Sequence, residues 1–318
     1  MTTTLCQRNS RLHSAATWRG QAGRGFAVAS EDRPYRSVWS ELYATEFRQG
    51  WIDAGSLRTR FIEAGSPKAP ALIFLHGTAG SWENFALNIA AHAEHFHCFA
   101  FDMIGAGLTD KPDYDYETQH YVKHLNDFMD AVKVDRASLI GLSLGARVAS
   151  RFGIDHPQRT DKLILLSATA YFPAQEIQKS IGASRSAAAS HPTWDNVRNI
   201  LKDLVHDEAS LVDDLIALRL AIYRRPEMKK AMGHILALLD PPVYNRNRIP
   251  DDDWRKLTAP TMIVASVDHA DVFLETSRAI ARLIPNVHVV EMTQTSHWPQ
   301  LERPELFNRL SLEFLRKQ

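Results

Sequence analysis

One short stretch limits the folds open to this chain, because it joins an apolar run to a Gly-x-Ser-x-Gly motif. The run, residues 139–142, is typical of a buried strand, and Ser143 stands between Gly141 and Gly145 ahead of a helix-like stretch, residues 146–152. A serine hydroxyl becomes an effective nucleophile when a sharp strand-to-helix turn holds it out of the strand end, near a base. Glycines suit this turn because a side chain would collide with the crowded backbone. The alternative is a plain turn with a capping serine, so the motif needs partners elsewhere.

Length and charge restrict the partners that we expect. The chain has 318 residues, enough for one large α/β domain with an insertion or for two ordinary domains. Its 37 basic and 37 acidic side chains give a formal net charge of zero, so nothing global indicates nucleic acid or an anionic membrane. We therefore expect a small-molecule substrate, no nucleic-acid or membrane partner, and no metal or other cofactor. A homodimer stays open.

Cysteines and apolar runs indicate a cellular location. The two cysteines, Cys6 and Cys98, are far apart and cannot build a disulfide framework or a cysteine-rich metal site, which suits a reducing compartment. No apolar run reaches transmembrane length. These features predict a cytoplasmic protein.

The first 36 residues are predicted to be a flexible basic leader. Residues 1–30 contain four arginines and no acidic residue. That composition matches an organelle transit peptide, a disordered tail or an overlong start, and a transit peptide would make the protein mitochondrial. A continuous apolar stretch of the kind found in secretion signals is missing.

Strands and helices then alternate in a way that predicts a parallel sheet covered on both faces. An antiparallel edge hairpin is expected within residues 49–65. Further strands are expected at residues 71–77, 98–102, 162–168, 261–267 and 287–292, and helices at residues 82–92, 120–132, 274–283 and 304–316. The sheet-forming core is predicted to span residues 37–170 and 251–318.

Residues 171–250 break this alternation and are predicted to form a helical cap. Helical periodicity appears at residues 194–205, 210–223 and 228–239, separated by prolines and without a convincing strand. An all-helical insertion over the carboxyl edge of the sheet is the economical interpretation.

A nucleophilic serine needs a base and a group that orients the base. Of fourteen histidines, His297 lies in the loop after the last predicted strand, where the carboxyl-end loops of an open parallel sheet converge. The acid should follow the strand at residues 261–267, where the loop offers Asp268 and Asp271. Asp268 is the preferred acid because it stands directly at the strand end. Whichever is not the acid should cap the next helix.

The oxyanion formed during acyl attack needs preorganised donors. The backbone N–H of Leu144, next to the nucleophile, is one candidate, and that of Thr78 is the second. Gly77 and Gly80 would let the backbone of this turn lie close to a substrate.

Together these motifs resemble the α/β-hydrolase superfamily over about residues 49–316. The resemblance is carried by His76-Gly77, by Asp102-x-x-Gly105-x-Gly107, by the serine motif, and by His297 followed by Glu302-Arg303-Pro304-Glu305. It implies a mostly parallel eight-stranded sheet flanked by helices, with the helical insertion as the cap domain.

Within that superfamily the chain is most similar to the meta-cleavage product hydrolases, which split carbon–carbon bonds in vinylogous 1,5-diketones from aromatic catabolism. The similarity lies in residues 297–302, 307–310 and 213–219. It implies that Arg219 binds the substrate carboxylate and that Trp298 lines the pocket. On residue pattern alone, Arg219 could equally belong to a solvated face or a surface ion pair, and Trp298 could pack on the last helix.

Three positions depart from that family. Leu142 stands where the family has a polar Asn before the nucleophile, beside the expected substrate, and residues 78–80 are poorer in glycine than the family's turn. A gapless match would place His269 at the acid position, so a shift of one residue is needed to reach Asp268.

The favoured function is therefore a serine hydrolase with a Ser143-His297-Asp268 triad that cleaves a carbon–carbon bond of a ring-fission diketone. A carboxylesterase or lactonase is the first alternative. A hydrolase-fold ligand receptor with slow turnover is the second, and a hydrolase-like protein that has lost its acid is the third.

Overall fold

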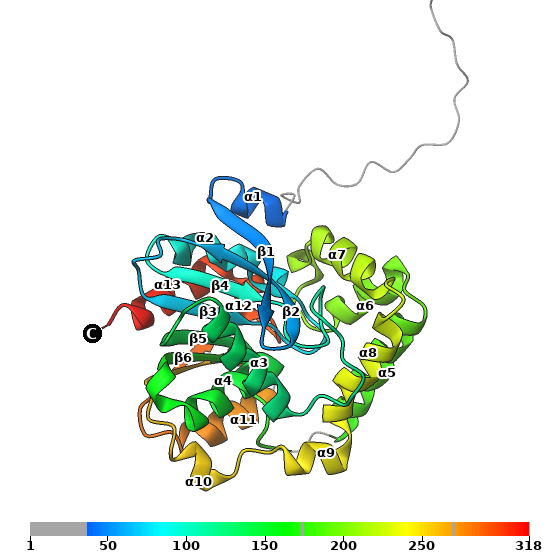
Figure 1. Ribbon diagram of the computed structural model, residues 1–318. Coiled ribbons are helices and arrows are strands. Elements are labelled where there is room, and N and C mark those ends of the chain that lie inside the picture. Colours follow the sequence, from blue (N-terminus) through cyan, green and yellow to red (C-terminus); the bar gives the residue numbers. More distant parts are fainter. Residues whose placement is uncertain (1–36, 173–174, 269–270, 318) are drawn as a thin grey trace, which may run out of the picture. The chain divides into compact units, whose positions relative to one another are not determined.

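The computed structural model describes residues 37–172, 175–268 and 271–317 (Figure 1). The predicted leader and His269 lie outside these residues. The described part of the chain contains no helix long and apolar enough to span a membrane.

One eight-stranded sheet runs through the described residues in the order β1-β2-β4-β3-β5-β6-β7-β8. Only the pairings of β2 with β1 and with β4 are antiparallel, and the other neighbours are parallel. The strands are β1 (Phe47–Ala54), β2 (Leu57–Ala64), β3 (Ala71–Leu75), β4 (His97–Phe101), β5 (Ala137–Leu142), β6 (Thr160–Leu166), β7 (Thr261–Ser266) and β8 (Val287–Met292). This confirms the mostly parallel sheet and the edge hairpin expected from the sequence.

Uninterrupted apolar runs occupy the middle of this sheet because both of its faces are covered there. All six residues of β5 are buried, and β3 and β4 are buried except for their first residues. Cys98 on β4 has only 1% of its surface exposed, and its thiol is free. Burial raises the pKa of this thiol.

Helices pack on both faces of the sheet (Figure 1). On one side α2 (Ala86–Ala93), α12 (Pro299–Glu302) and α13 (Pro304–Leu315) contact one another, and on the other α3 (Thr118–Ala131) contacts α4 (Leu144–Asp155). The helix α11 (Val272–Ala281) packs on β7, and the short α1 (Val38–Leu42) packs on α2.

Between β6 and β7 the described residues form helices and no strand. This helical segment, residues 171–250, contains α5 (Gln175–Ser190), α6 (Trp194–Lys202), α7 (Asp213–Tyr223), α8 (Met228–Leu236) and α9 (Pro241–Arg246), and α10 (Asp251–Trp254) follows it. Three of these helices match the predicted periodic stretches. The domain limits drawn from the sequence, with a cap at residues 171–250, stay a prediction.

Two helices of this segment were not predicted. α5 is rich in serine and alanine, and two polar residues on it, Gln178 and Arg185, are buried, so its sequence lacks a clear apolar stripe. α9 begins at Pro241, although the sequence pattern indicates a chain break at its two prolines. Proline is well accommodated at the first helical positions, because the N–H groups there have no partner within the helix.

A buried ion-pair network anchors the loop that carries Gly105 and Gly107. The Asp102 carboxylate accepts hydrogen bonds from Arg60 Nε at 2.6 Å and from the backbone N–H groups of Trp82 and Leu108 at 2.9 and 2.8 Å. A Cβ on Gly107 would overlap the Asp102 side chain. The Asp-x-x-Gly-x-Gly motif is therefore structural, because the Asp102 carboxylate ties the loop after β4 to β2 and to the segment that begins at Trp82.

Candidate active site

Ser143 lies on a strained turn between β5 and α4. Its φ and ψ are 54° and −109°, a region that residues other than glycine rarely occupy. Its backbone N–H donates to Leu166 O at 2.9 Å, which ties the turn to the end of β6. A Cβ on Gly141 would overlap the Gly145 carbonyl, and one on Gly145 would overlap the Leu75 carbonyl. Both glycines of the motif are thus required by close packing of the turn against β3 and α4.

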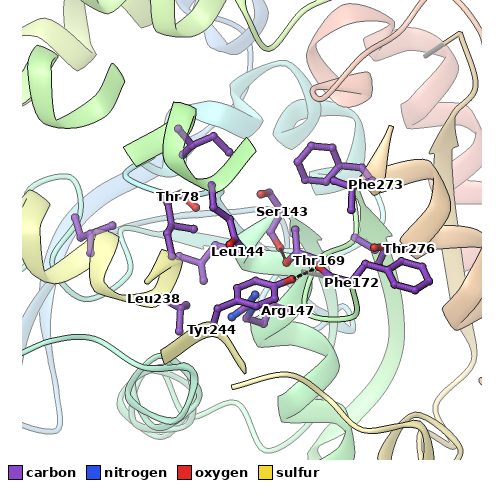
Figure 2. A pocket seen from close by; sticks show the side chains of 16 residues that line it. Thr78, Ser143, Leu144, Arg147, Thr169, Phe172, Leu238, Tyr244, Phe273 and Thr276 are labelled. Carbon is purple, nitrogen blue, oxygen red and sulfur yellow. Dashed lines mark hydrogen bonds between the residues drawn. The ribbon is translucent and has the colours of Figure 1, made fainter. Parts of the chain in front are cut away.

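Two cavities meet at Ser143. The larger is mostly apolar and extends toward the helical segment (Figure 2). Its lining includes Leu144, Phe172, Leu238, Tyr244 and Phe273.

The smaller cavity is polar. It is lined by Asn84, Arg185, Arg219, His297 and Trp298, together with Gly77, Thr78, Gly80, Ile181 and Leu204. Ser143 also lines it, so the serine stands where a polar compartment meets an apolar one.

His297 is brought to this polar cavity by the loop after β8. Its backbone N–H donates to Leu204 O at 3.1 Å, and its carbonyl accepts from Ser167 Oγ at 2.8 Å. The ring packs edge-on against Phe273, with 4.4 Å between ring centroids. Burial, together with the smaller effect of the Arg185 cation, lowers the pKa of His297 to about 3. The imidazole is therefore neutral, which is the form that can accept a proton from serine.

Further hydrogen bonds hold the histidine loop. Glu302 Oε1 accepts from the N–H groups of Ser296 and Trp298 at 2.8 and 3.3 Å. Ser266 Oγ, at the end of β7, donates to Ser296 O at 2.6 Å. Glu302, which belongs to a motif noted in the sequence, thus stabilises the loop that carries the base.

The described residues do not form a complete hydrogen-bonded triad. None of their hydrogen bonds joins Ser143 Oγ to His297, and His297 Nδ1 is buried without a partner among them. Asp268 is exposed and accepts from the N–H groups of Gln294 and Thr295 on the histidine loop. Asp271 caps α11 by accepting from the N–H groups of Phe273 and Leu274.

In the described part of the chain neither aspartate is therefore hydrogen-bonded to the His297 ring. Asp271 shares a small third cavity with His297, whereas Asp268 is bonded to the loop's backbone two and three residues before the histidine. The helix-capping role expected for one of the pair is taken by Asp271. The identity of the acid stays a prediction.

The two expected oxyanion donors border the larger cavity next to Ser143. Among the described residues, no hydrogen bond occupies the backbone N–H of Thr78 or of Leu144. The Thr78 turn is compact: Ala79 has a φ of 53°, and a Cβ on Gly80 would overlap the Asn84 side chain. Gly80 is thus needed for packing against Asn84. The expected close approach of this backbone to a substrate stays a prediction.

Four residues were expected to bind substrate. Arg219 and Trp298 are buried side chains that line the smaller cavity, as does Gly77. Arg219 donates from Nη2 to Asn84 Oδ1 at 3.5 Å and belongs to no ion pair in the described part of the chain, so the solvated-face interpretation is wrong. Leu142 is buried within the sheet next to Gly77 and does not line either cavity, so we assign it to packing.

Sequence reasoning missed two buried arginines. Arg185 on α5 lines the smaller cavity, and its Nε has no partner among the described residues. Arg147 on α4 lies 4.6 Å from the Tyr244 ring in the larger cavity, and Tyr244 in turn donates to Phe172 O at 2.7 Å (Figure 2). Arg147 stands four residues after Ser143, which was the one available signal for it. The Ser/Ala-rich stretch around Arg185 has no sequence pattern that predicts a buried side chain at this position.

Residues 70–304 match the family model for the alpha/beta hydrolase fold. The chain belongs to the α/β-hydrolase family. Among curated relatives of this α/β-hydrolase, a 2-hydroxy-6-oxo-6-(2'-aminophenyl)hexa-2,4-dienoic acid hydrolase of Metapseudomonas resinovorans is 26% identical, covering 88% of this chain and 94% of the relative. A 2-hydroxy-6-oxononadienedioate/2-hydroxy-6-oxononatrienedioate hydrolase of Burkholderia vietnamiensis is also 26% identical, covering 83% and 93%.

Solved structures point the same way. A meta-cleavage product hydrolase from Pseudomonas fluorescens superposes on this α/β-hydrolase with a TM-score of 0.72 and 25% identity, covering 84% of this chain and 97% of the other. Its relatives thus identify this α/β-hydrolase as similar to enzymes that act on 2-hydroxy-6-oxo-dienoates.

Proposed function

We propose that this α/β-hydrolase cleaves the carbon–carbon bond of a 2-hydroxy-6-oxo-dienoate, a ring-fission diketone that carries a carboxylate. The observation that supports this most directly is Arg219. Its guanidinium is buried, forms no ion pair in the described part of the chain, and shares a cavity with Ser143 and His297. A buried cation without a counterion is costly, and a carboxylate on the substrate would compensate it.

The first half of the reaction forms an acyl-enzyme. Ser143 Oγ attacks the ketone carbon while His297 takes the serine proton, and the resulting oxyanion accepts hydrogen bonds from the N–H groups of Thr78 and Leu144. In the 2-oxo tautomer of the substrate, collapse of this intermediate breaks the carbon–carbon bond and the bond electrons pass through the double bond to the 2-oxo oxygen. The proton held by His297 neutralises the enolate that forms. The dienoate fragment leaves, and the acyl group stays on Ser143.

The second half releases the acyl group. Water attacks the acyl carbon, His297 takes a proton from that water, and the same two N–H groups hold the second oxyanion. When the intermediate collapses, the proton returns to Ser143 Oγ and a carboxylic acid departs. Asp268 is proposed to orient His297 and to stabilise its cation during both halves.

The two cavities support a matching orientation of the substrate. The dienoate head would lie in the smaller cavity against Arg219 and Trp298, and the acyl part would lie in the larger, apolar cavity. In this orientation the ketone carbon between the two parts falls at Ser143.

The test compares a diketone with a neutral ester. Replacing Arg219 with Ala should lower kcat/KM for 2-hydroxy-6-oxo-2,4-heptadienoate by about tenfold to a hundredfold, since a charge-assisted bidentate contact contributes about 1.5–3 kcal/mol. Arg219→Lys should restore part of the loss, because a point charge cannot copy the planar fork. A neutral aryl ester should be hydrolysed nearly as fast by both variants as by the wild type.

Other outcomes would assign a different function. Equal losses on diketone and ester would make Arg219 a structural residue. If the wild type hydrolyses aryl esters or lactones and leaves the diketone intact, the protein is a carboxylesterase or lactonase.

A further inference from the structure

We propose that Arg185 and Arg219 act together as a two-guanidinium site that selects substrates with a doubly negative head, a carboxylate next to a second anionic oxygen. This inference rests on the proposed function, because it describes how the same cavity recognises its substrate. It adds a second arginine that the resemblance to known families did not supply.

Arg185 is built into the cavity wall. It projects from α5, is 6% exposed, and lines the smaller cavity with Ser143, His297 and Arg219. Its Nε is fully buried and has no hydrogen-bond partner among the described residues. This N–H is a donor whose solvation has been removed and not replaced.

The protein does not neutralise this pair. None of the ion pairs among the described residues includes Arg185 or Arg219, which is also 6% exposed. Asp203 lies close enough to favour the charged form of Arg185, but it is exposed and makes no ion pair with it. Two like charges in one buried cavity repel each other, so an anion is the group that stabilises both.

A second buried donor without a partner lies near the arginines. The Tyr223 hydroxyl is buried and has no partner in the described part of the chain. The Tyr223 ring centroid is 5.8 Å from the Arg219 guanidinium carbon, and the hydroxyl is close enough to influence the charge on Arg185.

The number of charges determines the class of ligand. One carboxylate balances one guanidinium and leaves the other buried cation uncompensated. A carboxylate joined to an enolate oxygen, or to a second carboxylate, balances both with two adjacent anionic groups. A 2-oxo acid in its enolate form and a short dicarboxylate share this chemistry.

Binding of small anions tests the proposal without turnover. Oxalate, with two adjacent carboxylates, and acetate, with one, are titrated by calorimetry at fixed pH and ionic strength, since screening would otherwise obscure the comparison. We expect the wild type to bind oxalate at least about tenfold more tightly than acetate, because a second charge-assisted contact is gained.

Variants assign that selectivity to a residue. Arg185→Met should weaken oxalate binding by about tenfold or more and change acetate binding by less than about threefold, because acetate needs only Arg219. Arg224→Met removes the same charge from an exposed position at the end of α7 and should leave both affinities unchanged. If Arg185→Met fails to fold, Arg185→Lys should fold and show a partial loss for oxalate.

The proposal is overturned if wild-type protein binds oxalate no better than acetate, or if the Arg185 variants weaken both anions equally. Binding is independent of catalysis. Diketone hydrolysis without oxalate selectivity would overturn this inference and leave the proposed function intact. Oxalate selectivity without diketone hydrolysis would overturn the proposed function and leave the two-guanidinium site intact.

Discussion

At the scale of single residues, Ser143 is positioned by its backbone. Its φ of 54° and the N–H bond to Leu166 hold the hydroxyl at the junction of two cavities before any substrate arrives. Catalytic hydrogen bonds often tighten only in the substrate complex, so the missing bond to His297 is compatible with a serine–histidine pair.

We therefore predict that Ser143→Ala and His297→Ala each lower kcat on an aryl ester by about 10³ or more. Because the two residues act as a unit, the double variant should be little worse than either single variant. Steady-state kinetics on purified protein measure all three. Losses that multiply in the double variant would contradict a shared role.

The acid requires a separate comparison. Asp268→Asn should lower kcat far more than Asp271→Asn, since a neutral amide at position 268 could neither orient the base as a carboxylate does nor stabilise its cation. Asparagine is also a good helix N-cap, so Asp271→Asn should leave α11 nearly as stable. Thermal unfolding of both variants serves as the control. The opposite ranking of activities would move the acid to Asp271, and two active variants would exclude both aspartates of this loop as the acid.

The residues of the site differ in how well they could be predicted from the sequence. Ser143 and His297 stand in local motifs, so their places could be predicted from neighbouring residues. The acid could not be fixed, because its partner is chosen by three-dimensional contact and the loop offers two carboxylates. Arg185 could not be predicted as a site residue. Buried positions are recognised in a sequence by a periodic pattern of apolar residues, and a buried arginine does not fit that pattern.

At the scale of elements, the turn between β5 and α4 is the tightest contact of the site. A Cβ on Gly145 would meet the Leu75 carbonyl on β3, and backbone cannot yield as a flexible side chain can. Gly145→Ala should therefore lower the free energy of unfolding by about 1–3 kcal/mol or more and disturb the nucleophile. Chemical denaturation and ester turnover measure the two effects.

Gly233→Ala is the matched control. Gly233 lies within α8, and nothing lies within 4 Å of the position that its Cβ would occupy. Alanine there should raise stability by about 0.4–1 kcal/mol and leave turnover unchanged. A Gly145→Ala variant as stable and active as this control would show that the turn relaxes without cost.

The strands were easier to predict than the helices. Buried parallel strands have continuous apolar sequences, and the edge hairpin was marked by its Gly-Ser turn, so each strand was located before the structure. α5 and α9 were missed because one buries polar side chains toward the cavity and the other starts with prolines. Both exceptions lie in the helical segment that borders the substrate cavities.

At the scale of the whole molecule, buried histidines make stability depend on pH. Burial lowers the pKa of His76 and His92 to about 4 and that of His124 and His297 to about 3. The unfolded chain protonates them near pH 6.5, whereas the folded chain does not, so folding loses stability as pH falls below 6.5. The exposed ion pairs of His234 raise its pKa and act in the opposite direction, above pH 6.5.

The expected slope is large. Each proton taken up on unfolding changes stability by about 1.4 kcal/mol per pH unit, so four histidines give a slope of about 5 kcal/mol per unit between pH 6 and pH 5. Urea denaturation at several pH values measures it. His124→Gln should reduce the slope by about one quarter, and a flat profile would mean that these rings are protonated in the folded state. The sequence shows fourteen histidines and does not reveal which are buried.

The reaction rate of the buried Cys98 thiol can report how fast the sheet opens. Because β4 lies between β2 and β3, a disulfide reagent can reach this sulfur only after strands at the centre of the sheet have separated. In a Cys6→Ser background, the rate at which the reagent is consumed would therefore measure the rate at which the sheet opens. Comparing that rate with and without oxalate would measure how strongly occupation of a cavity at the strand ends slows the separation of strands beneath it.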